Sequence, residues 1–359
     1  MQCSFAILAV TAIVVALSGS CTLGTDVGLG KGTLLKLTEI RSFAGFHKAA
    51  FSADGKSLAL VDGVHVDVVE AGSGRTLVTL ARPKALFLSA RLSPDGQVLS
   101  AAYKREEAAG QTSIEIAFWE AASGRQKLTL PIVDHDWRRP VDDLSFSPDG
   151  RLLASSIGGI ARLWDTASGK EVRRFVPAVQ EEIEAERVLL SPDGRWLAGY
   201  FRASNAQMLR VWNVETGEQK EFATEVYSDW RFSNDSKLLA VAAVTDKGKP
   251  AERSAAEIWD VGAARRLTVI ETPREWRGAY TVAFSPDSKL LAIGGYKKFG
   301  VFSIESGELL VQETHHSPGF LQDYEISNQL NHIEFSSDGN LLLTSGDDST
   351  VKLWRVERK

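Results

Sequence analysis

Short apolar segments recur along the chain, and each follows the same kind of polar turn. The turn appears seven times, as FSADG (51–55), LSPDG (92–96), FSPDG (146–150), LSPDG (190–194), FSNDS (232–236), FSPDS (284–288) and FSSDG (335–339). Proline presets the first corner of such a turn, Asp bonds the local backbone, and Gly tolerates the exit conformation. The apolar segment that follows, such as LLAS at 152–155, predicts a short buried strand.

A second recurring strand ends at a tryptophan, in most copies beside an acidic residue. It reads FWE (118–120), LWD (163–165), VWN (211–213), IWD (258–260) and LWR (353–355). Two further copies carry Val69 and Phe302 in place of Trp. Another turn, such as ASGK at 167–170, then leads into a further strand. One unit is therefore predicted to contain four short strands, joined by two tight turns and two connections of variable length.

The spacing of these units is typical of propeller blades. The turn aspartates lie between 41 residues (Asp54 to Asp95) and 54 residues (Asp95 to Asp149) apart, near the ~40–45 residues of one blade. A lone four-stranded sheet cannot bury both of its faces, so such units pack side by side around an axis. On these units the chain resembles the WD-repeat family over residues 34–356. The resemblance implies an all-β fold: a seven-bladed β-propeller of four-stranded antiparallel blades, in a single domain over 34–359.

The resemblance also implies how the ring closes. The last unit reaches LWRV at 353–356 without a fourth strand, whereas GTLLKLTEI at 32–40 precedes the first unit. In the family an N-terminal strand completes the last blade, so we expect residues 34–40 to pair with 351–356 and to remove two free sheet edges. An ideal blade of the family also links a His, a Ser or Thr, an Asp and a Trp by hydrogen bonds. Here Thr344, Asp348 and Trp354 match, and Ile326 stands where the His is expected.

Composition limits the classes of function. Hydrophobic residues make up 44% of the 359 residues and charged residues 24%, which is ordinary for a soluble globular domain. The formal net charge of −5 argues against a nucleic-acid partner. The sequence contains no G-x-S-x-G elbow, no H-E-x-x-H motif and no phosphate loop, so we predict neither catalysis nor a cofactor.

The N-terminal segment predicts export. Residues 5–17 are apolar and too short for a comfortable membrane span, but they suit the core of a signal peptide. The following LSGSC, which ends at Cys21, resembles the lipobox of bacterial lipoproteins, although Leu17 stands four residues before the cysteine rather than three. We expect a signal peptide at 1–20, lipidation of Cys21, a flexible tether at 21–33, and a place in the cell envelope, periplasmic or membrane-tethered through Cys21. A plain cleaved signal or an uncleaved anchor remains an alternative.

The length variation among the units predicts which face of the propeller is functional. It falls in two connections, between the second and third strands of a unit and between successive units, and these emerge on one face, here called the wide-loop face. The opposite plain face carries the repeated turns. Two loops on the wide-loop face, DHDWRRP (134–140) and PREWRGA (273–279), place Trp beside Arg, the residue types that dominate binding hot spots. The candidate partner-binding residues are His135, Trp137, Arg138, Arg139, Arg274, Trp276, Arg277, His315, His316 and Tyr324.

Several alternatives stay open at this point. Trp137 and Trp276 could instead pack inward over the ends of neighbouring blades. His315 with His316, and His135 alone, are weak metal candidates, since adjacent residues of an extended chain point in opposite directions. We predict a non-catalytic protein-binding scaffold of the bacterial cell envelope, monomeric, without nucleic acid, and touching the membrane only through its anchor. The alternatives are a hydrolase- or lactonase-like enzyme or small-ligand binder with its site at the central channel, and a purely structural envelope component.

Overall fold

The computed structural model describes residues 35–106, 112–131, 144–157, 160–175, 184–202, 207–224, 226–245, 253–315 and 329–358. All of them belong to one compact unit, Thr33–Lys359. The predicted signal peptide, the tether and Cys21 lie outside the described residues. In the described part of the chain, no helix has the length and hydrophobicity that a membrane span requires.

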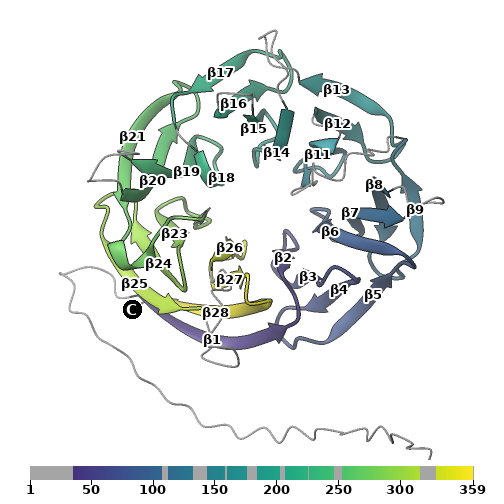
Figure 1. Cartoon of the computed structure of the whole chain (residues 1–359), viewed down its shortest axis with the longest axis horizontal. Coiled ribbons are helices and arrows are strands. Elements are labelled where there is room, and N and C mark those ends of the chain that lie inside the picture. The colour runs from purple at the N-terminus through teal and green to yellow at the C-terminus, as the bar shows by residue number, and fades with distance from the viewer. Residues whose placement is uncertain are drawn as a thin grey trace, which may run out of the picture. The chain divides into compact units, whose positions relative to one another are not determined.

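Seven four-stranded antiparallel sheets are arranged around a central axis, which confirms the predicted seven-bladed propeller (Figure 1). Blade 1 contains β2 (Lys48–Phe51), β3 (Ser57–Val61), β4 (His65–Glu70) and β5 (Thr76–Ala81). Blade 2 contains β6 (Ala85–Leu92), β7 (Val98–Glu106), β8 (Thr112–Glu120) and β9 (Gln126–Thr129). Blade 3 contains β10 (Ser145–Phe146), β11 (Leu152–Ser155), β12 (Ala161–Asp165) and β13 (Glu171–Phe175). Blade 4 contains β14 (Glu184–Leu190), β15 (Trp196–Arg202), β16 (Gln207–Asn213) and β17 (Gln219–Phe222).

The remaining blades follow the same plan. Blade 5 contains β18 (Val226–Phe232), β19 (Leu238–Thr245), β20 (Arg253–Asp260) and β21 (Arg265–Glu271). Blade 6 contains β22 (Thr281–Phe284), β23 (Leu290–Gly294), β24 (Lys298–Ser303) and β25 (Leu309–Thr314), preceded by the short 3-10 helix η3 (Arg274–Trp276). Blade 7 contains β26 (Leu330–Phe335), β27 (Leu341–Gly346), β28 (Thr350–Arg358) and β1 (Leu35–Ala44). The first strand of each blade lies near the axis, and the last strand lies on the rim (Figure 1).

The ring closes as predicted, over a longer stretch. β1 pairs antiparallel with β28 from Leu35 opposite Arg358 to Ala44 opposite Thr350, with one irregularity between Glu39 and Arg41. Lys352, a residue of β28, is buried, and its Nζ lies 3.0 Å from Oε2 of Glu39 on β1. Closure therefore rests on backbone pairing along the whole of β1 and on a partly buried ion pair.

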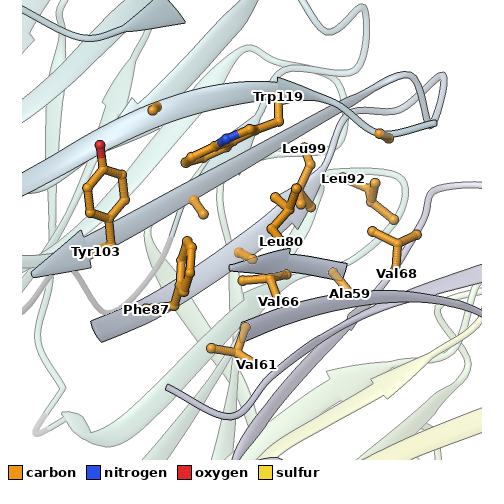
Figure 2. Packing of buried hydrophobic residues seen from close by; sticks show 14 residues of the cluster. Ala59, Val61, Val66, Val68, Leu80, Phe87, Leu92, Leu99, Tyr103 and Trp119 are labelled. Atoms are coloured by element: carbon orange, nitrogen blue, oxygen red, sulfur yellow. The ribbon is translucent and has the colours of Figure 1, made fainter. Parts of the chain in front are cut away.

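Apolar packing joins each blade to the next. Seven buried clusters lie one at each interface between neighbouring blades. Figure 2 shows the cluster between blades 1 and 2, where Val66 and Val68 face Phe87 and Trp119. The rings of Phe87, Tyr103 and Trp119 meet at tilted or edge-to-face angles with centroids 5.8 to 6.3 Å apart. The repeated Trp position, including its substitutes Val69 and Phe302, is thus core in every blade.

The hydrogen-bonded set of the last blade is complete, which corrects the prediction for Ile326. His315, which is buried, stands at the position expected for the histidine: its Nδ1 lies 2.8 Å from Thr344 Oγ1, and its Nε2 lies 3.5 Å from Asp348 Oδ1. Trp354 Nε1 donates to the same Thr344 Oγ1 at 2.8 Å. The long segment between His315 and β26 displaced the expected position in the sequence, and Ile326 lies outside the described residues.

The seven repeated turns share one hydrogen-bonding plan on the plain face. In the turn at 147–150, Ser147 Oγ donates to Asp149 Oδ1 at 2.6 Å and accepts from Leu152 N at 2.9 Å. The pKa of Asp149 lies below its ordinary value, first because of the hydrogen bond from Ser147 and then because of the Arg151 backbone N–H. The pKa is lowered in the same direction at the other six turn aspartates, Asp54, Asp95, Asp193, Asp235, Asp287 and Asp338.

These turns predict acid sensitivity. The folded-state pKa of Asp149 is depressed. The ionised carboxylate therefore contributes to the unfolding free energy at pH values above the ordinary Asp pKa, and this contribution is lost as the pH falls through the folded-state pKa. We expect Ser147→Ala to lower the unfolding free energy by about 1 kcal/mol at pH 7, and the gap to wild type to narrow at about pH 3. Urea unfolding at both pH values measures this gap, with Ser337→Ala, an exposed serine of the turn in blade 7, as the control. A gap that stayed constant or widened in acid would contradict the assignment.

Candidate functional site

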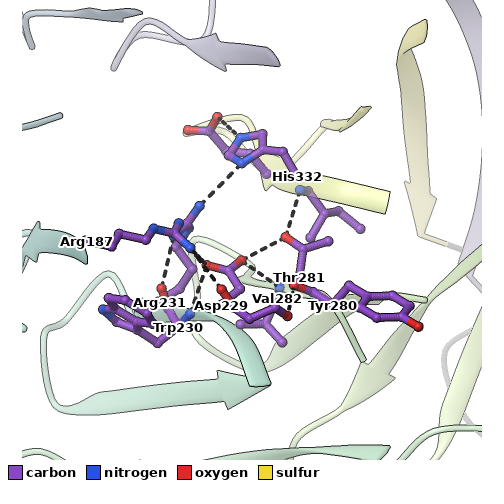
Figure 3. A network of polar contacts seen from close by, with 11 residues as sticks. Arg187, Asp229, Trp230, Arg231, Tyr280, Thr281, Val282 and His332 are labelled. Carbon is purple, nitrogen blue, oxygen red and sulfur yellow. Dashed lines mark hydrogen bonds and ion pairs between the residues drawn. The ribbon is translucent and has the colours of Figure 1, made fainter. Parts of the chain in front are cut away.

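The central channel is lined by alternate residues of the innermost strands. Each repeated turn has a serine, such as Ser147, as its second residue, here called the turn serine. The residues two and four positions before this serine are polar in most blades. In blades 4 to 7, polar side chains at these positions form a continuous network (Figure 3). Asp229 is at its centre. The Oδ1 atom of Asp229 lies 2.8 Å from Arg187 Nη1 and 2.8 Å from Arg231 Nη1, and its Oδ2 atom accepts from Thr281 Oγ1 at 2.8 Å. Burial alone would raise the pKa of Asp229, but Arg187, Arg231 and the hydrogen bonds hold it below its ordinary value.

The network continues to blade 7 through a neutral histidine. Arg231 Nη2 lies 3.3 Å from His332 Nδ1, and His332 Nε2 lies 3.2 Å from Glu334 Oε2. Because a guanidinium only donates, Nδ1 must accept, so Nε2 carries the proton that is donated to Glu334. Burial, aided by the charges of Arg231 and Arg91, lowers the pKa of His332, which agrees with a neutral ring. For Glu334 burial acts to raise the pKa, but the interactions with His332, the charge of Arg91 and the hydrogen bond from Phe51 N–H together outweigh it, so the pKa is lowered.

The same side chains bind the free backbone edge of the next blade. Four of them accept from a main-chain N–H of the neighbouring innermost strand, namely Ser145 from Leu190 (3.0 Å), Asp229 from Val282 (3.1 Å), Thr281 from Ile333 (3.2 Å) and Glu334 from Phe51 (3.2 Å). Two positions therefore recur. A side chain two residues before its turn serine accepts from the residue directly before the turn serine of the next blade, as Ser145 and Glu334 do. A side chain four residues before its turn serine accepts from the residue three before the next turn serine, as Asp229 and Thr281 do. Much of the polar lining of the channel is therefore committed to joining blades.

On the wide-loop face, the segment before blade 6 is anchored by a buried tryptophan. Trp276, the last residue of η3, is fully buried, and its ring meets Phe302 edge to face with centroids 5.8 Å apart. A Cβ at Gly300 would lie 2.8 Å from Trp276 Cη2 and a Cβ at Gly295 2.8 Å from Trp276 Cβ, so both positions require glycine. In four of the other six blades the residue equivalent to Gly300 is a buried polar side chain: Arg162, Arg210, Glu257 or Lys352. The indole fills this position in blade 6.

Above the tryptophan, basic side chains surround a tyrosine. Tyr296 N donates to Trp276 O at 2.7 Å, which fixes the loop between β23 and β24 against η3. Arg277 Cζ and Lys297 Nζ each lie 5.3 Å from the centroid of the Tyr296 ring, within cation–π range. We call the five residues Arg274, Arg277, Tyr296, Lys297 and Lys298 the blade 6 platform. Arg274 and Arg277 are exposed, and the other three are half-buried.

The predicted partner-binding residues divide into three groups. Burial removes Trp276 and His315 from the possible surface contacts: the first is core of blade 6, and the second belongs to the hydrogen-bonded set of blade 7. Arg274 and Arg277 are exposed on the wide-loop face, and their role in binding stays a prediction. The other six, His135, Trp137, Arg138, Arg139, His316 and Tyr324, lie outside the described residues. Among the residues that are described, no three His, Cys, Asp or Glu side chains gather as a metal site would require.

Sequence reasoning missed the other half of the platform. Tyr296, Lys297 and Lys298 lie in a connection too short to attract notice among the longer ones. The available signal was its composition, an aromatic residue followed by two lysines. The channel network was missed for a related reason, because its signal appears only when the seven units are aligned on the turn serine and the alternate positions before it are compared.

Comparison with known proteins agrees with this fold. The model of the family described as "WD domain, G-beta repeat" matches residues 126–165 and 321–355. The matches support the WD40-repeat family. Periodic tryptophan protein 2 of Saccharomyces cerevisiae is 21% identical over 279 residues, which cover 59% of this chain and 30% of that protein. COMPASS component SWD3 of the same organism is 26% identical over 204 residues (54% and 60%), and Protein LST8 homolog of Drosophila melanogaster is 24% identical over 248 residues (67% and 72%).

The chain therefore spans about 30% of the length of the periodic tryptophan protein and 60% of the length of the COMPASS component.

The centre of the channel network can be tested by stability. Removing the Asp229 carboxylate takes a counter-charge from the partly buried cations Arg187 and Arg231 and leaves the Val282 N–H without its acceptor. We expect Asp229→Ala to cost about 3–5 kcal/mol of unfolding free energy, and Asp229→Asn, which keeps an acceptor, to cost less. Chemical denaturation at pH 7 measures both. Equal losses below about 1 kcal/mol for the two variants would show that the network contributes little.

Proposed function

We propose that this protein is a non-catalytic protein-binding scaffold of the bacterial cell envelope, exported by residues 1–20 and held there through Cys21. The wide-loop face is the binding face. The observation that carries the proposal is the contrast between the two faces of the ring. The plain face repeats one short turn seven times, whereas the wide-loop face combines connections of different length with exposed basic and apolar side chains.

Exposed apolar side chains on the wide-loop face support this choice. Val64 is 57% exposed in the loop between β3 and β4, and Leu86 at the start of β6 is 48% exposed. The two loops are in contact, since Phe87 N donates to Gly63 O at 2.6 Å. Such residues on a rigid scaffold suit a protein interface, where a few well-placed side chains supply most of the affinity.

The state of the channel groups also supports a scaffold. A catalytic acid or base needs a pKa close to the working pH and access to a substrate. The pKa values of Asp229 and Glu334 are instead lowered, and both carboxylates accept hydrogen bonds that join blades. One of the relatives is, by its name, a component of COMPASS, which is consistent with a propeller acting as a subunit of an assembly.

The binding face can be tested by cross-linked pull-down from the native cells. The wide-loop variant carries Val64→Glu and Leu86→Glu. The matched control carries Leu77→Glu and Val172→Glu, which alter side chains of similar exposure (44% and 56%) on the rim strands β5 and β13. We expect quantitative mass spectrometry to show partners captured by wild type and by the rim variant but at least tenfold depleted with the wide-loop variant. Partners lost only with the rim variant would place binding on the circumference.

Export and anchoring need a separate test. We expect the chain to incorporate an alkyne-labelled fatty acid in bacterial cells and to fractionate with membranes. Cys21→Ser should abolish the label and release the protein in soluble form into the exported fraction, while Cys3→Ser should change neither. A label that persists in Cys21→Ser, or a chain retained in the cytoplasm, would contradict the anchor.

A further inference from the structure

We propose that the blade 6 platform binds an acidic segment of a protein partner, with Arg277 and Lys297 as the cations that contact its carboxylates. This inference rests on the proposed function, because it names the chemistry of the partner for one part of the wide-loop face.

Backbone strain is concentrated at these two cations. Arg277 has φ 52° and Lys297 has φ 62°, a left-handed conformation that side chains with a Cβ rarely adopt. The other positive-φ residues that are not glycine in the described chain are Lys84, Ser236, Ala264, Ser288 and Ser349, each on a different loop or turn. Only at the platform do two strained residues hold their side chains over one ring. Strain of this kind gathers where a geometry is needed for binding.

The support beneath the platform keeps these cations in place. Arg277 N donates to Arg274 O at 3.2 Å, and Tyr280 Oη donates to Arg277 O at 3.0 Å. Trp276 anchors the same segment in the core, and its Nε1 is buried without a hydrogen-bond partner in the described structure. An orphaned buried N–H is unfavourable. The blade therefore contains an unsatisfied indole N–H and two strained residues, and this arrangement holds the exposed Arg277 and the half-buried Lys297 beside one ring.

In the part of the chain that the structure describes, the platform cations have no carboxylate partner. Within the described residues, none of Arg274, Arg277, Lys297 and Lys298 forms an ion pair with a carboxylate. Plain-face cations behave differently: Lys56 lies 3.7 Å from Asp54 and Arg195 lies 2.6 Å from Asp193. Only Glu275 adds a negative charge to the segments 274–277 and 296–298. A locally basic surface on a chain of net charge −5 is complementary to an anionic partner.

The geometry favours carboxylates along an extended segment. An arginine presents a planar fork that matches a carboxylate, a lysine supplies a point charge, and the half-buried tyrosine ring beside them adds apolar surface near the methylene groups of Glu side chains. Two separate cations, each 5.3 Å from the centroid of one ring, can each pair with one of two acidic side chains.

The test uses fluorescein-labelled octaglutamate and the full chain in mild detergent, with binding followed by fluorescence anisotropy at 50 mM NaCl. The decisive variant is Arg277→Gly combined with Lys297→Gly, because glycine removes both cations and also relieves the left-handed strain. We expect at least tenfold weaker binding together with an unfolding midpoint that is unchanged or higher. The control, Lys237→Ala with Lys289→Ala, removes two plain-face cations and should change affinity less than twofold. Wild-type binding should also weaken at 300 mM NaCl.

Several outcomes would overturn the inference. These are absence of octaglutamate binding by wild type, equal binding of labelled octaserine, or unchanged affinity in the double glycine variant. Binding to vesicles of anionic phosphatidylglycerol without binding to the peptide would reassign the platform to a membrane surface. If the pull-down partners are lost with the Val64→Glu and Leu86→Glu variant but kept by the double glycine variant, the scaffold function stands and the acidic-segment proposal fails.

Discussion

The pairing of β1 with β28 converts seven separate sheets into a ring in which every blade has two neighbours. Each blade buries apolar side chains on both faces, and each of the seven interfaces holds its own apolar cluster. Without β1, blade 7 would lose its rim strand and the cluster between blades 6 and 7 would lose Leu35 and Leu37. The Lys352–Glu39 ion pair adds a polar contact at this seam, where desolvation makes the removal of a single partner costly.

The polar side chains of the channel answer a need of the sheet edges that remain unpaired after the ring has closed. The free edge of a rim strand faces outward. The free edge of an innermost strand faces the central channel, and its backbone N–H groups need hydrogen-bond acceptors there. Ser145, Asp229, Thr281 and Glu334 supply them from the preceding blade. Arg187 and Arg231 then balance the charge of Asp229, and the neutral His332 donates a hydrogen bond to Glu334. These channel groups are thus engaged in joining blades, and the proposed binding face is the wide-loop face.

The architecture could be predicted from the sequence because its signal is repeated. Seven turns and seven Trp-like positions recur in the same order, so each copy supports the others. They predicted the number of blades, and the family resemblance that they carry predicted the closing strand. Features that occur once were harder to predict. His315 was separated from its Thr, Asp and Trp partners by a long segment, so sequence spacing pointed to Ile326 instead. For Trp276, beside two arginines, the sequence left both surface exposure and inward packing open, and the glycines at 295 and 300 indicate that space exists for it inside blade 6.

The four channel side chains that accept from a backbone N–H all do so in one direction around the ring. Each accepts from the blade that follows its own. The contact from Glu334 to Phe51 crosses the seam between blades 7 and 1 and has the same form as the contacts between consecutive blades. The seam between blades 7 and 1 is thus joined in the same manner as the step from blade 3 to blade 4. A circularly permuted chain, with its ends moved to another rim strand and β1 linked to β28, would therefore keep these four inner contacts unchanged.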